Sequence, residues 1–348
     1  MLLYIIKQLD RTKFDVGILS FENGELLKEF PADVPVFVAP HKYNIRQKIL
    51  FQFGINPTFN YVRKVAKEFN ADFWYVNTIM IPHVNTIAQE FNVKVITHFH
   101  ELPLTYAYLS TSDFKSIVNA SNLLIGCSQV TCDAITDTGA KNVELLYSFI
   151  DSEKIKADQS RSNQLREKLG IAPTDFVWIL SGMTSERKGF DFLPEIAKEL
   201  NDPQTHLVWV GNQINDGLVY YTEQKCLNYK SQTRVHFTGK QKEDYYNYLN
   251  LGNGFLLTSR QDPFPLVMIE AAFLGKPIVS FPSGGASEFI QDGMGLVTED
   301  ISVKQMVDAM RKIMRGTIAT DAAKSTQRAS QFNVSNGYKQ WLDIIEKL

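Results

Sequence analysis

The chain has 348 residues, of which 44% are hydrophobic and 21% are charged, proportions typical of soluble globular proteins and enough length for two ordinary domains. Its formal net charge of −2 lacks the basic excess of a nucleic-acid-binding protein, so we expect no nucleic-acid partner. No run of 18 apolar residues occurs, which argues against a membrane-spanning helix. We therefore expect a cytoplasmic protein, with peripheral attachment to the inner face of the membrane as an option.

The first segment of the chain predicts a helix followed by short strands. Residues 2–9 form an amphipathic pattern, and they lack the basic start and the small-residue cleavage site of a signal peptide. Residues 13–21 and 35–39 are short apolar runs that predict strands. An α/β arrangement therefore begins near the start of the chain. The three cysteines have no metal-ligand spacing, which predicts buried thiols in a reducing compartment; they are Cys127, Cys132 and Cys226.

Basic and aromatic residues alternate between residues 41 and 69. The basic ones fall between residues 42 and 67, and the region reads as helical. One interpretation is contact with an anionic membrane surface that holds a lipid-linked acceptor. The other is an ordinary solvated helix face above core aromatics, and the sequence leaves both open. The residues concerned are Lys42, Arg46, Lys48, Arg63, Lys64 and Lys67, with Tyr43, Phe51, Phe53, Phe59 and Tyr61.

Two histidines follow one of the buried strands of the first domain. Strands are predicted at 72–77, 93–98, 122–128 and 143–147, with helices at 83–91 and 129–138 between them, and such alternation predicts a parallel sheet. His98 and His100 lie at the carboxyl end of the second of these strands, where open α/β sheets bind ligands. A structural role is the commoner one for His98. Glu101 either orients the His100 imidazole or caps the following segment.

A second run of strands and helices follows a polar segment at 150–163, which we interpret as an interdomain linker. The alternation of elements predicts a second doubly wound sheet, with strands at 176–180, 206–211, 234–238, 254–258, 277–281 and 295–297. We predict domains at 1–150 and 151–333. Residues 334–348 form an amphipathic helix.

Two strand–loop–helix stretches carry the ionisable residues of a candidate site. In SGMTSERKGFD, Gly182 allows close approach after a strand, and Arg187 and Lys188 precede a helix; two adjacent cations suit a diphosphate. In TSRQDPFPLVMIEAAFLGKPIVS, Asp262 lies in the loop and Glu270 lies about a turn into the helix. Two acids placed in this way can accept hydrogen bonds from a hydroxyl-rich ligand. The free N–H groups at the helix start favour a phosphate or a hydroxyl.

Taken together, these residues resemble glycosyltransferase family 4 enzymes of GT-B architecture. The resemblance rests on Gly182, on the adjacent Arg187 and Lys188, on the spacing of the two acids within DPFPLVMIEAAFLGKPIVSF, on the following GGASEF, and on His100 in ITHFHEL. It covers residues 96–295. It implies an α/β protein of two Rossmann-like, doubly wound parallel-sheet domains facing across a cleft. It also implies that the 334–348 helix crosses back to the acceptor-side N-terminal domain.

The resemblance also assigns roles to individual residues. It implies that Glu270 binds the nucleotide ribose, that Asp262 binds hydroxyls of the transferred sugar, and that Arg187, Lys188 and His100 form the catalytic set. It places the donor beside the backbone N–H groups of Phe264 and Leu266, beside Pro265, which cannot donate, and beside a tight loop at Gly284 and Gly285. Many family members have Glu at the first acid and Gly in place of Pro265. They also open with a strand and a glycine-rich loop, so the first strand is expected to be missing here.

The resemblance predicts a retaining transferase that uses a nucleoside diphosphate sugar and a saccharide or lipid-linked acceptor, in cell-surface polysaccharide or glycoconjugate synthesis. The sequence contains no Asp-x-Asp pair at a strand end and no His/Asp cluster, so we expect no metal and no other cofactor; side-chain cations would stabilise the leaving diphosphate. Two other kinds of protein would show the same sequence features of the donor site. A nucleotide-sugar epimerase would have the same architecture, and a binding module would retain the donor residues without catalysis.

Overall fold

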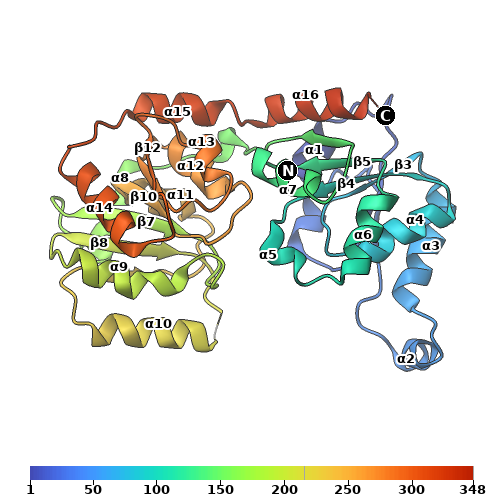
Figure 1. Cartoon of the computed structure of the whole chain (residues 1–348), viewed down its shortest axis with the longest axis horizontal. Coiled ribbons are helices and arrows are strands. Elements are labelled where there is room, and N and C mark those ends of the chain that lie inside the picture. Colours follow the sequence, from blue (N-terminus) through green and yellow to red (C-terminus); the bar gives the residue numbers. More distant parts are fainter. Residues whose placement is uncertain (215, 348) are drawn as a thin grey trace. The chain divides into compact units, whose positions relative to one another are not determined.

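The computed structural model describes residues 1–214 and 216–347 and divides into two compact units. Unit 1 comprises Met1–Leu146 and Gly337–Leu348, and unit 2 comprises Tyr147–Asn336. The division after Leu146 precedes the predicted one after residue 150. Each unit consists of parallel strands that alternate with helices (Figure 1).

Unit 1 contains a four-stranded parallel sheet with the order β3-β4-β5-β6, and β1 and β2 pair separately in a two-stranded parallel sheet. Its elements are α1 (Leu2–Gln8), β1 (Ile18–Ser20), the 3-10 helix η1 (Glu25–Glu29), β2 (Val36–Val38), α2 (Ile45–Gln52), α3 (Pro57–Phe69), β3 (Phe73–Val76), α4 (Pro82–Glu90), β4 (Lys94–Phe99), α5 (Pro103–Tyr106), α6 (Thr111–Ala120), β5 (Leu123–Gly126), α7 (Gln129–Thr136) and β6 (Val143–Leu145).

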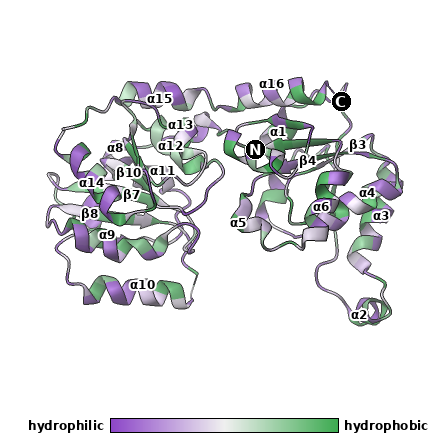
Figure 2. Cartoon of the chain, in the orientation of Figure 1, coloured by the Kyte–Doolittle hydropathy of each residue, from purple (hydrophilic) through white to green (hydrophobic). Residues whose placement is uncertain are grey.

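The core of unit 1 forms around β4 and β5. Five successive residues of β4, from Val95 to Phe99, are buried, and every residue of β5 is buried, as expected for strands covered on both faces. Phe99 and Leu124 pack with Ile117 of α6 and Ile135 of α7. Figure 2 shows the hydropathy of the elements of this unit. The sheet is therefore a rigid platform for the loops that follow its strands.

Unit 2 contains a six-stranded parallel sheet with the order β12-β11-β10-β7-β8-β9. Its elements are η2 (Ser152–Lys154), α8 (Gln159–Lys168), β7 (Phe176–Ser181), η3 (Phe190–Phe192), α9 (Leu193–Leu200), β8 (Thr205–Val210), α10 (Gly217–Asn228), β9 (Arg234–Phe237), α11 (Tyr245–Leu251), β10 (Gly254–Leu257), α12 (Leu266–Phe273), β11 (Ile278–Ser280), α13 (Ala286–Phe289), β12 (Gly295–Val297), α14 (Val303–Met314), α15 (Ala322–Ser330) and α16 (Val334–Ile345), whose residues from Gly337 onward belong to unit 1.

The strand order of unit 2 reverses between β7 and β10. From β7 the chain builds outward through β8 and β9, and β10 then returns to the other side of β7 before β11 and β12 follow. Helices α9, α10 and α14 cover one face, where Trp178 and Trp209 lie in the core (Figure 1). Open α/β sheets bind ligands at the carboxyl ends of strands where the order reverses. The loops after β7 and β10 therefore lie where a ligand-binding site is expected.

One sequence prediction is wrong in this region. The segment 150–163, interpreted as a polar linker, contains η2 and the first half of α8. Asp158 caps α8 by accepting a hydrogen bond from the Arg161 N–H, and the Arg161 side chain pairs with Asp244. Polar contacts of this kind accompany the burial of Ser162 and Leu165 where α8 packs against α11. A helix held in this way needs only a narrow apolar face, which is why its sequence resembled a linker.

Candidate active site

The candidate site of unit 2 is built from the loops that follow β7 and β10. Gly182 directly follows β7 and has a positive φ of 154°, a conformation that side chains with a Cβ rarely adopt. The loop then runs through Arg187 and Lys188 to α9, and the loop after β10 runs from Thr258 through Asp262 to α12. The two predicted stretches thus meet at the point where the strand order reverses.

Lys188 and Asp262 form a close ion pair between these loops. The Lys188 Nζ atom contacts the Asp262 Oδ2 atom, and the two side chains are only 17% and 8% exposed. The Ser259 hydroxyl lies 3.3 Å from the same carboxylate oxygen. Arg187, which is more exposed, has its Nη1 atom 3.9 Å from Asp262 Oδ2 and donates to the Gln261 carbonyl at 2.9 Å. The sequence suggested separate roles for the acid and the cations, whereas in the structure their side chains pair with each other.

Backbone contacts fix the position of this pair. The Thr258 hydroxyl donates to the Lys188 carbonyl at 2.9 Å, and the Arg260 N–H donates to the Arg187 carbonyl at 2.8 Å. Gly189 has a φ of 70°, and a Cβ there would lie 2.0 Å from the Thr258 carbonyl oxygen. Because only glycine allows this approach, the residue after the two cations holds the loops together, a role that the sequence analysis missed.

The loop at Gly284 and Gly285 packs against the Asp262 loop as predicted. The Asp262 N–H donates to the Ser283 carbonyl at 2.7 Å, and Asp262 forms an isolated parallel bridge with Gly284. A Cβ on Gly285 would lie 2.3 Å from the Pro263 carbonyl oxygen. These glycines therefore support the backbone that carries Asp262.

The start of α12 offers backbone N–H groups beside the exposed side chain of Leu266. Pro265 is the N-cap residue and Leu266 is the first helical residue. The Phe264 side chain is buried against Tyr147 and Phe332, with ring centroids 5.0 and 5.2 Å away. Its side chain therefore anchors the loop, and only its backbone can meet a ligand. The first N–H groups of a helix have no helical acceptor, which makes this end of α12 suited to phosphate or hydroxyl oxygens.

Glu270 is held by two tyrosines that the sequence analysis did not single out. The hydroxyls of Tyr245 and Tyr246 donate to its two carboxylate oxygens at 3.1 and 3.2 Å. Burial raises the pKa of Glu270, and the two hydroxyl hydrogen bonds oppose that rise. The Tyr245 hydroxyl also lies 3.0 Å from the Ser181 hydroxyl at the end of β7. The orientation of Glu270 is therefore set by α11 and β7 together.

His100 in unit 1 is oriented by an asparagine. Its Nε2 atom lies 3.0 Å from the Asn77 Oδ1 atom, and burial lowers the pKa of His100 to about 4. Neither of the two roles considered for Glu101 matches its contacts. Glu101 accepts from the His100 backbone N–H at 2.9 Å and from the Thr78 hydroxyl at 2.6 Å, and the following helix α5 has no side-chain cap. The neutral His100 ring can exchange hydrogen bonds but carries no charge near neutral pH.

His98 is a core residue. It is 1% exposed within β4, and its Nδ1 atom lies 2.6 Å from the Tyr75 hydroxyl. Its burial agrees with the structural role expected for His98. Cys127 and Cys132 are buried thiols, as predicted, while Cys226 is partly exposed. Within residues 1–214 and 216–347, no group of three or more His, Cys, Asp or Glu side chains is placed to hold a metal ion.

Similarity to known proteins covers the region of this site. The family model for glycosyl transferases group 1 matches residues 161–331. The chain is 26% identical over 271 residues to N-acetyl-alpha-D-glucosaminyl L-malate synthase of Bacillus anthracis, covering 73% of this chain and 68% of that protein. It is also 26% identical over 306 residues to alpha-galactosylglucosyldiacylglycerol synthase of Streptococcus pneumoniae, covering 80% of this chain and 78% of that protein.

Solved structures share the fold over the whole chain. Anabaena HepE, crystallised with UDP-glucose, superposes with a TM-score of 0.83 at 24% identity, covering 100% of this chain and 95% of that one. WaaG, a glycosyltransferase involved in lipopolysaccharide biosynthesis, superposes with a TM-score of 0.72 at 16% identity, covering 99% and 94%. The predicted α/β fold of two Rossmann-like domains, the GT-B architecture, is confirmed.

Proposed function

The chain is a glycosyltransferase of GT-B architecture with a group 1 glycosyltransferase domain, and on that premise we propose that it is a retaining enzyme of family 4. In this proposal it moves a sugar from a nucleoside diphosphate sugar to a saccharide or lipid-linked acceptor during synthesis of a cell-surface polysaccharide or glycoconjugate. The observation that carries the proposal is the ion pair of Lys188 with Asp262, flanked by Arg187, where the strand order reverses.

The ion pair accounts for donor binding as an exchange of partners. The diphosphate of the donor takes the place of the Asp262 carboxylate beside Lys188, and Arg187 lies close enough to meet the same group. Asp262 is then available to accept hydrogen bonds from hydroxyls of the sugar. The acid and the cations therefore serve adjoining parts of one ligand, and the ligand-free pairing keeps both charges compensated.

The chemical step breaks the bond between the anomeric carbon and the β-phosphate oxygen. Negative charge grows on the departing diphosphate, and Lys188, Arg187 and the start of α12 are the groups that stabilise this charge in the transition state. The acceptor oxygen forms the new bond on the face from which the diphosphate departs, which is what retention requires. Its proton passes to the departing phosphate oxygen, so the products are the glycoside and the nucleoside diphosphate.

Glu270 and His100 bind hydroxyl groups in this proposal. Glu270, oriented by Tyr245 and Tyr246, accepts from the ribose hydroxyls of the nucleotide. The His100 ring is neutral because burial lowers its pKa to about 4, so it can hydrogen-bond to the reacting sugar without adding charge. We further propose that transfer needs no metal ion, because the two side-chain cations supply the positive charge at the diphosphate.

We propose contact with an anionic membrane as the role of the basic and aromatic region at 42–67, and we centre this proposal on the segment 41–55. Two of the three cations of α3 have acidic partners: Arg63 pairs with Glu90 and Lys64 with Glu68, whereas no ion pair involves Lys67 among the described residues. Residues 41–55 contain no Asp or Glu, and Ile45 and Phe53 are 77% and 80% exposed. Figure 2 shows that α2 mixes hydrophilic and hydrophobic residues, which are not sorted onto opposite faces of the helix. The proposed contact therefore rests on the exposed apolar side chains and the unopposed basic charge of the segment, rather than on an amphipathic helix. In the described part of the chain, no helix is long and apolar enough to cross a membrane.

The test is a transfer assay with the intact chain. It is incubated with a panel of UDP-, GDP- and TDP-sugars and with saccharide and lipid acceptors, and both the glycosylated product and the free nucleoside diphosphate are measured. Product formation with retained anomeric configuration supports the proposal. Interconversion of the donor sugar without transfer would indicate an epimerase, and donor binding without turnover would indicate a binding module.

A further inference from the structure

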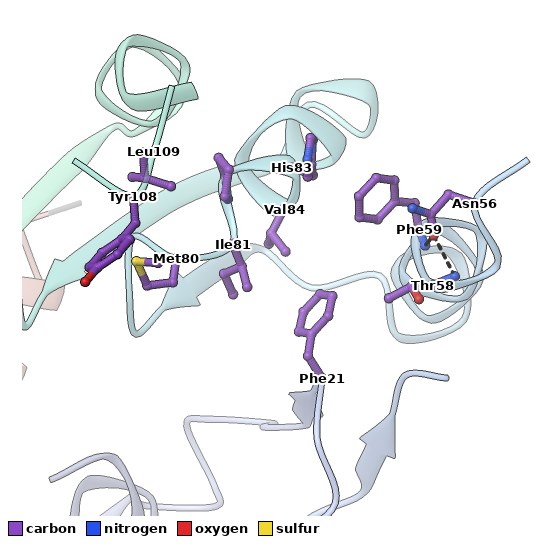
Figure 3. Close-up of a pocket in the computed structure, with 11 residues that line it drawn as sticks. Phe21, Asn56, Thr58, Phe59, Met80, Ile81, His83, Val84, Tyr108 and Leu109 are labelled. Carbon is purple, nitrogen blue, oxygen red and sulfur yellow. Dashed lines mark hydrogen bonds between the residues drawn. The ribbon is translucent and has the colours of Figure 1, made fainter. Parts of the chain in front are cut away.

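A hydrophobic pocket lies in unit 1 at the carboxyl ends of β1 and β3, with a volume of about 360 Å³. Figure 3 shows its side chains, which come from four places: the end of β1, the start of α3, the turn into α4, and the segment between α5 and α6. The volume falls within the range of pockets that bind small ligands. The lining residues are Phe21, Asn56, Thr58, Phe59, Met80, Ile81, Pro82, His83, Val84, Tyr108 and Leu109.

The protein itself engages the Asn56 carbonyl oxygen and the Thr58 hydroxyl of this pocket, while the His83 ring nitrogens and the Tyr108 hydroxyl are the other polar groups of its lining. The Asn56 Oδ1 atom accepts from the N–H groups of Thr58 and Phe59 at 3.0 and 3.2 Å, so it caps α3. The Thr58 hydroxyl donates to the Pro40 carbonyl at 2.6 Å. The His83 ring lies against Phe59, with ring centroids 4.6 Å apart. The surface left for a ligand is therefore mainly hydrocarbon and aromatic.

The lining also carries no charge that could hold a phosphate or a carboxylate. Among the described residues that form it, none is Asp, Glu, Lys or Arg. At its edge, Met80 and Tyr108 are 43% and 80% exposed, so apolar surface faces water when the pocket is empty. Burial of such surface is favourable, and the ligand that gains most from it is a hydrocarbon chain rather than a sugar or a phosphate.

Tyr43 connects the pocket to the segment 41–55. Its hydroxyl lies 3.1 Å from Asn56 Oδ1 and 2.7 Å from the Thr58 hydroxyl, and its ring centroid is 5.6 Å from that of Phe51 on α2. The segment also carries Lys42, Arg46 and Lys48 without any acid, which is complementary to an anionic lipid surface. The exposed apolar side chains of α2 and the pocket thus belong to one continuous part of unit 1.

We propose that this pocket binds the hydrocarbon chain of a lipid-linked acceptor, in the part of the chain next to the polar head. The proposal rests on the proposed glycosyl transfer and names its acceptor as amphipathic. Contact of the segment 41–55 with the membrane places the pocket beside the lipid surface, and a chain that leaves the bilayer there exchanges lipid contacts for Phe21, Ile81 and Val84. The polar head of the acceptor then stays outside the pocket, in water.

The experiment measures binding of alkyl maltosides to the intact chain by isothermal titration calorimetry, below the critical micelle concentration. Dodecyl maltoside is the probe, octyl maltoside tests chain length, and maltose is the control without a chain. The test variant is Met80→Glu, which adds charge at the exposed edge. The matched control is Leu26→Glu, at an apolar residue of unit 1 that lies outside the pocket lining and is 57% exposed, against 43% for Met80.

We expect dodecyl maltoside to bind more tightly than octyl maltoside, maltose not to bind, and Met80→Glu to weaken dodecyl maltoside binding at least tenfold while Leu26→Glu leaves it unchanged. Equal affinities for the two variants, or binding of maltose alone, would overturn the proposal. Thermal unfolding of both variants establishes that they are folded; if Met80→Glu unfolds, Tyr108→Ala takes its place.

Transfer assays separate this proposal from the proposed function. If transfer to saccharide acceptors occurs but the chain-bearing probes do not bind, only the pocket assignment is wrong. If the probes bind through the pocket but no acceptor is ever glycosylated, the pocket stands as a hydrocarbon site and the proposed transferase reaction fails.

Discussion

Replacing Lys188 by Met tests the central interaction of the donor site. The variant keeps the aliphatic part of the side chain but removes the charge that contacts Asp262, and the two side chains are only 17% and 8% exposed. Breaking a buried pair from one side typically costs about 3–5 kcal/mol. Here Arg187, at 3.9 Å, and the Ser259 hydroxyl, at 3.3 Å, still face the carboxylate. We therefore expect a smaller loss in the free energy of unfolding, of about 1–3 kcal/mol.

The same variant should lose affinity for nucleoside diphosphates. A hydrogen bond to a charged group contributes about 1.5–3 kcal/mol, so the dissociation constant for UDP or GDP should rise by roughly ten- to 150-fold. Asp262→Asn should act in the opposite direction. It removes the internal partner of Lys188, so affinity for the free nucleoside diphosphate should stay the same or rise by up to about tenfold, while sugar transfer falls.

Calorimetric titration of the nucleoside diphosphate and urea unfolding provide the measurements, with the double variant completing the thermodynamic cycle. Lys312→Met, at an exposed position on α14, is the control for loss of a lysine charge. If Lys188→Met and Asp262→Asn weaken nucleotide binding equally, the exchange of partners described above is refuted.

Four further outcomes test other parts of the structure. Arg187→Ala should lower kcat/KM by about 2–4 kcal/mol in transition-state free energy, with little change in the unfolding midpoint, because the charge that it meets grows during the reaction; unchanged turnover would remove it from the mechanism. Transfer should survive excess EDTA, and inactivation that magnesium or manganese reverses would contradict this. Nucleotide affinity should fall at low pH as Glu270 becomes protonated, and Tyr245→Phe should shift this fall to higher pH, because the Tyr245 hydroxyl opposes the rise in the Glu270 pKa that burial causes. An unchanged pH dependence of nucleotide affinity would mean that Glu270 does not bind the nucleotide. Burial lowers the pKa of His236 to about 4, below the unfolded value of about 6.5. The contribution of His236 to the free energy of unfolding is therefore fully present above pH 6.5 and is lost as the pH falls toward 4. In urea unfolding, His236→Gln should make the free energy of unfolding less dependent on pH over this range.

The sheets and the loops of the site could be predicted because their signals are local. Strands such as β7 and β8 are runs of buried apolar residues bounded by glycine, and Pro265 marks the start of α12. Each of these patterns depends on only a few neighbouring residues. A strand that is covered on both faces is built almost entirely from apolar residues, so it can be recognised from its own sequence. The order of the two stretches along the chain was enough to bring Arg187, Lys188 and Asp262 to one end of the sheet.

The pairing of side chains could not be predicted in the same way. Lys188 and Asp262 are 74 residues apart, and Tyr245 and Glu270 are 25 residues apart, so no sequence period links them. Glu101 shows the converse case, because it is next to His100 and one of its two considered roles was to orient the ring, yet it binds the His100 backbone and Thr78. Adjacent residues on an extended chain point in different directions, so adjacency argued for a contact that the geometry of the turn does not allow.

The ion pair also bears on how the proposed enzyme would distinguish its donor from its product. A nucleoside diphosphate that takes Lys188 from Asp262 leaves a carboxylate that is only 8% exposed with Arg187 and Ser259 as its neighbours, and an under-compensated buried charge is costly. A nucleotide sugar offsets this cost, because its sugar hydroxyls donate hydrogen bonds to the same carboxylate. The free nucleoside diphosphate has no sugar hydroxyls to donate to Asp262. The arrangement therefore favours the donor over the leaving product and assists product release, since Lys188 can return to Asp262 as the diphosphate departs.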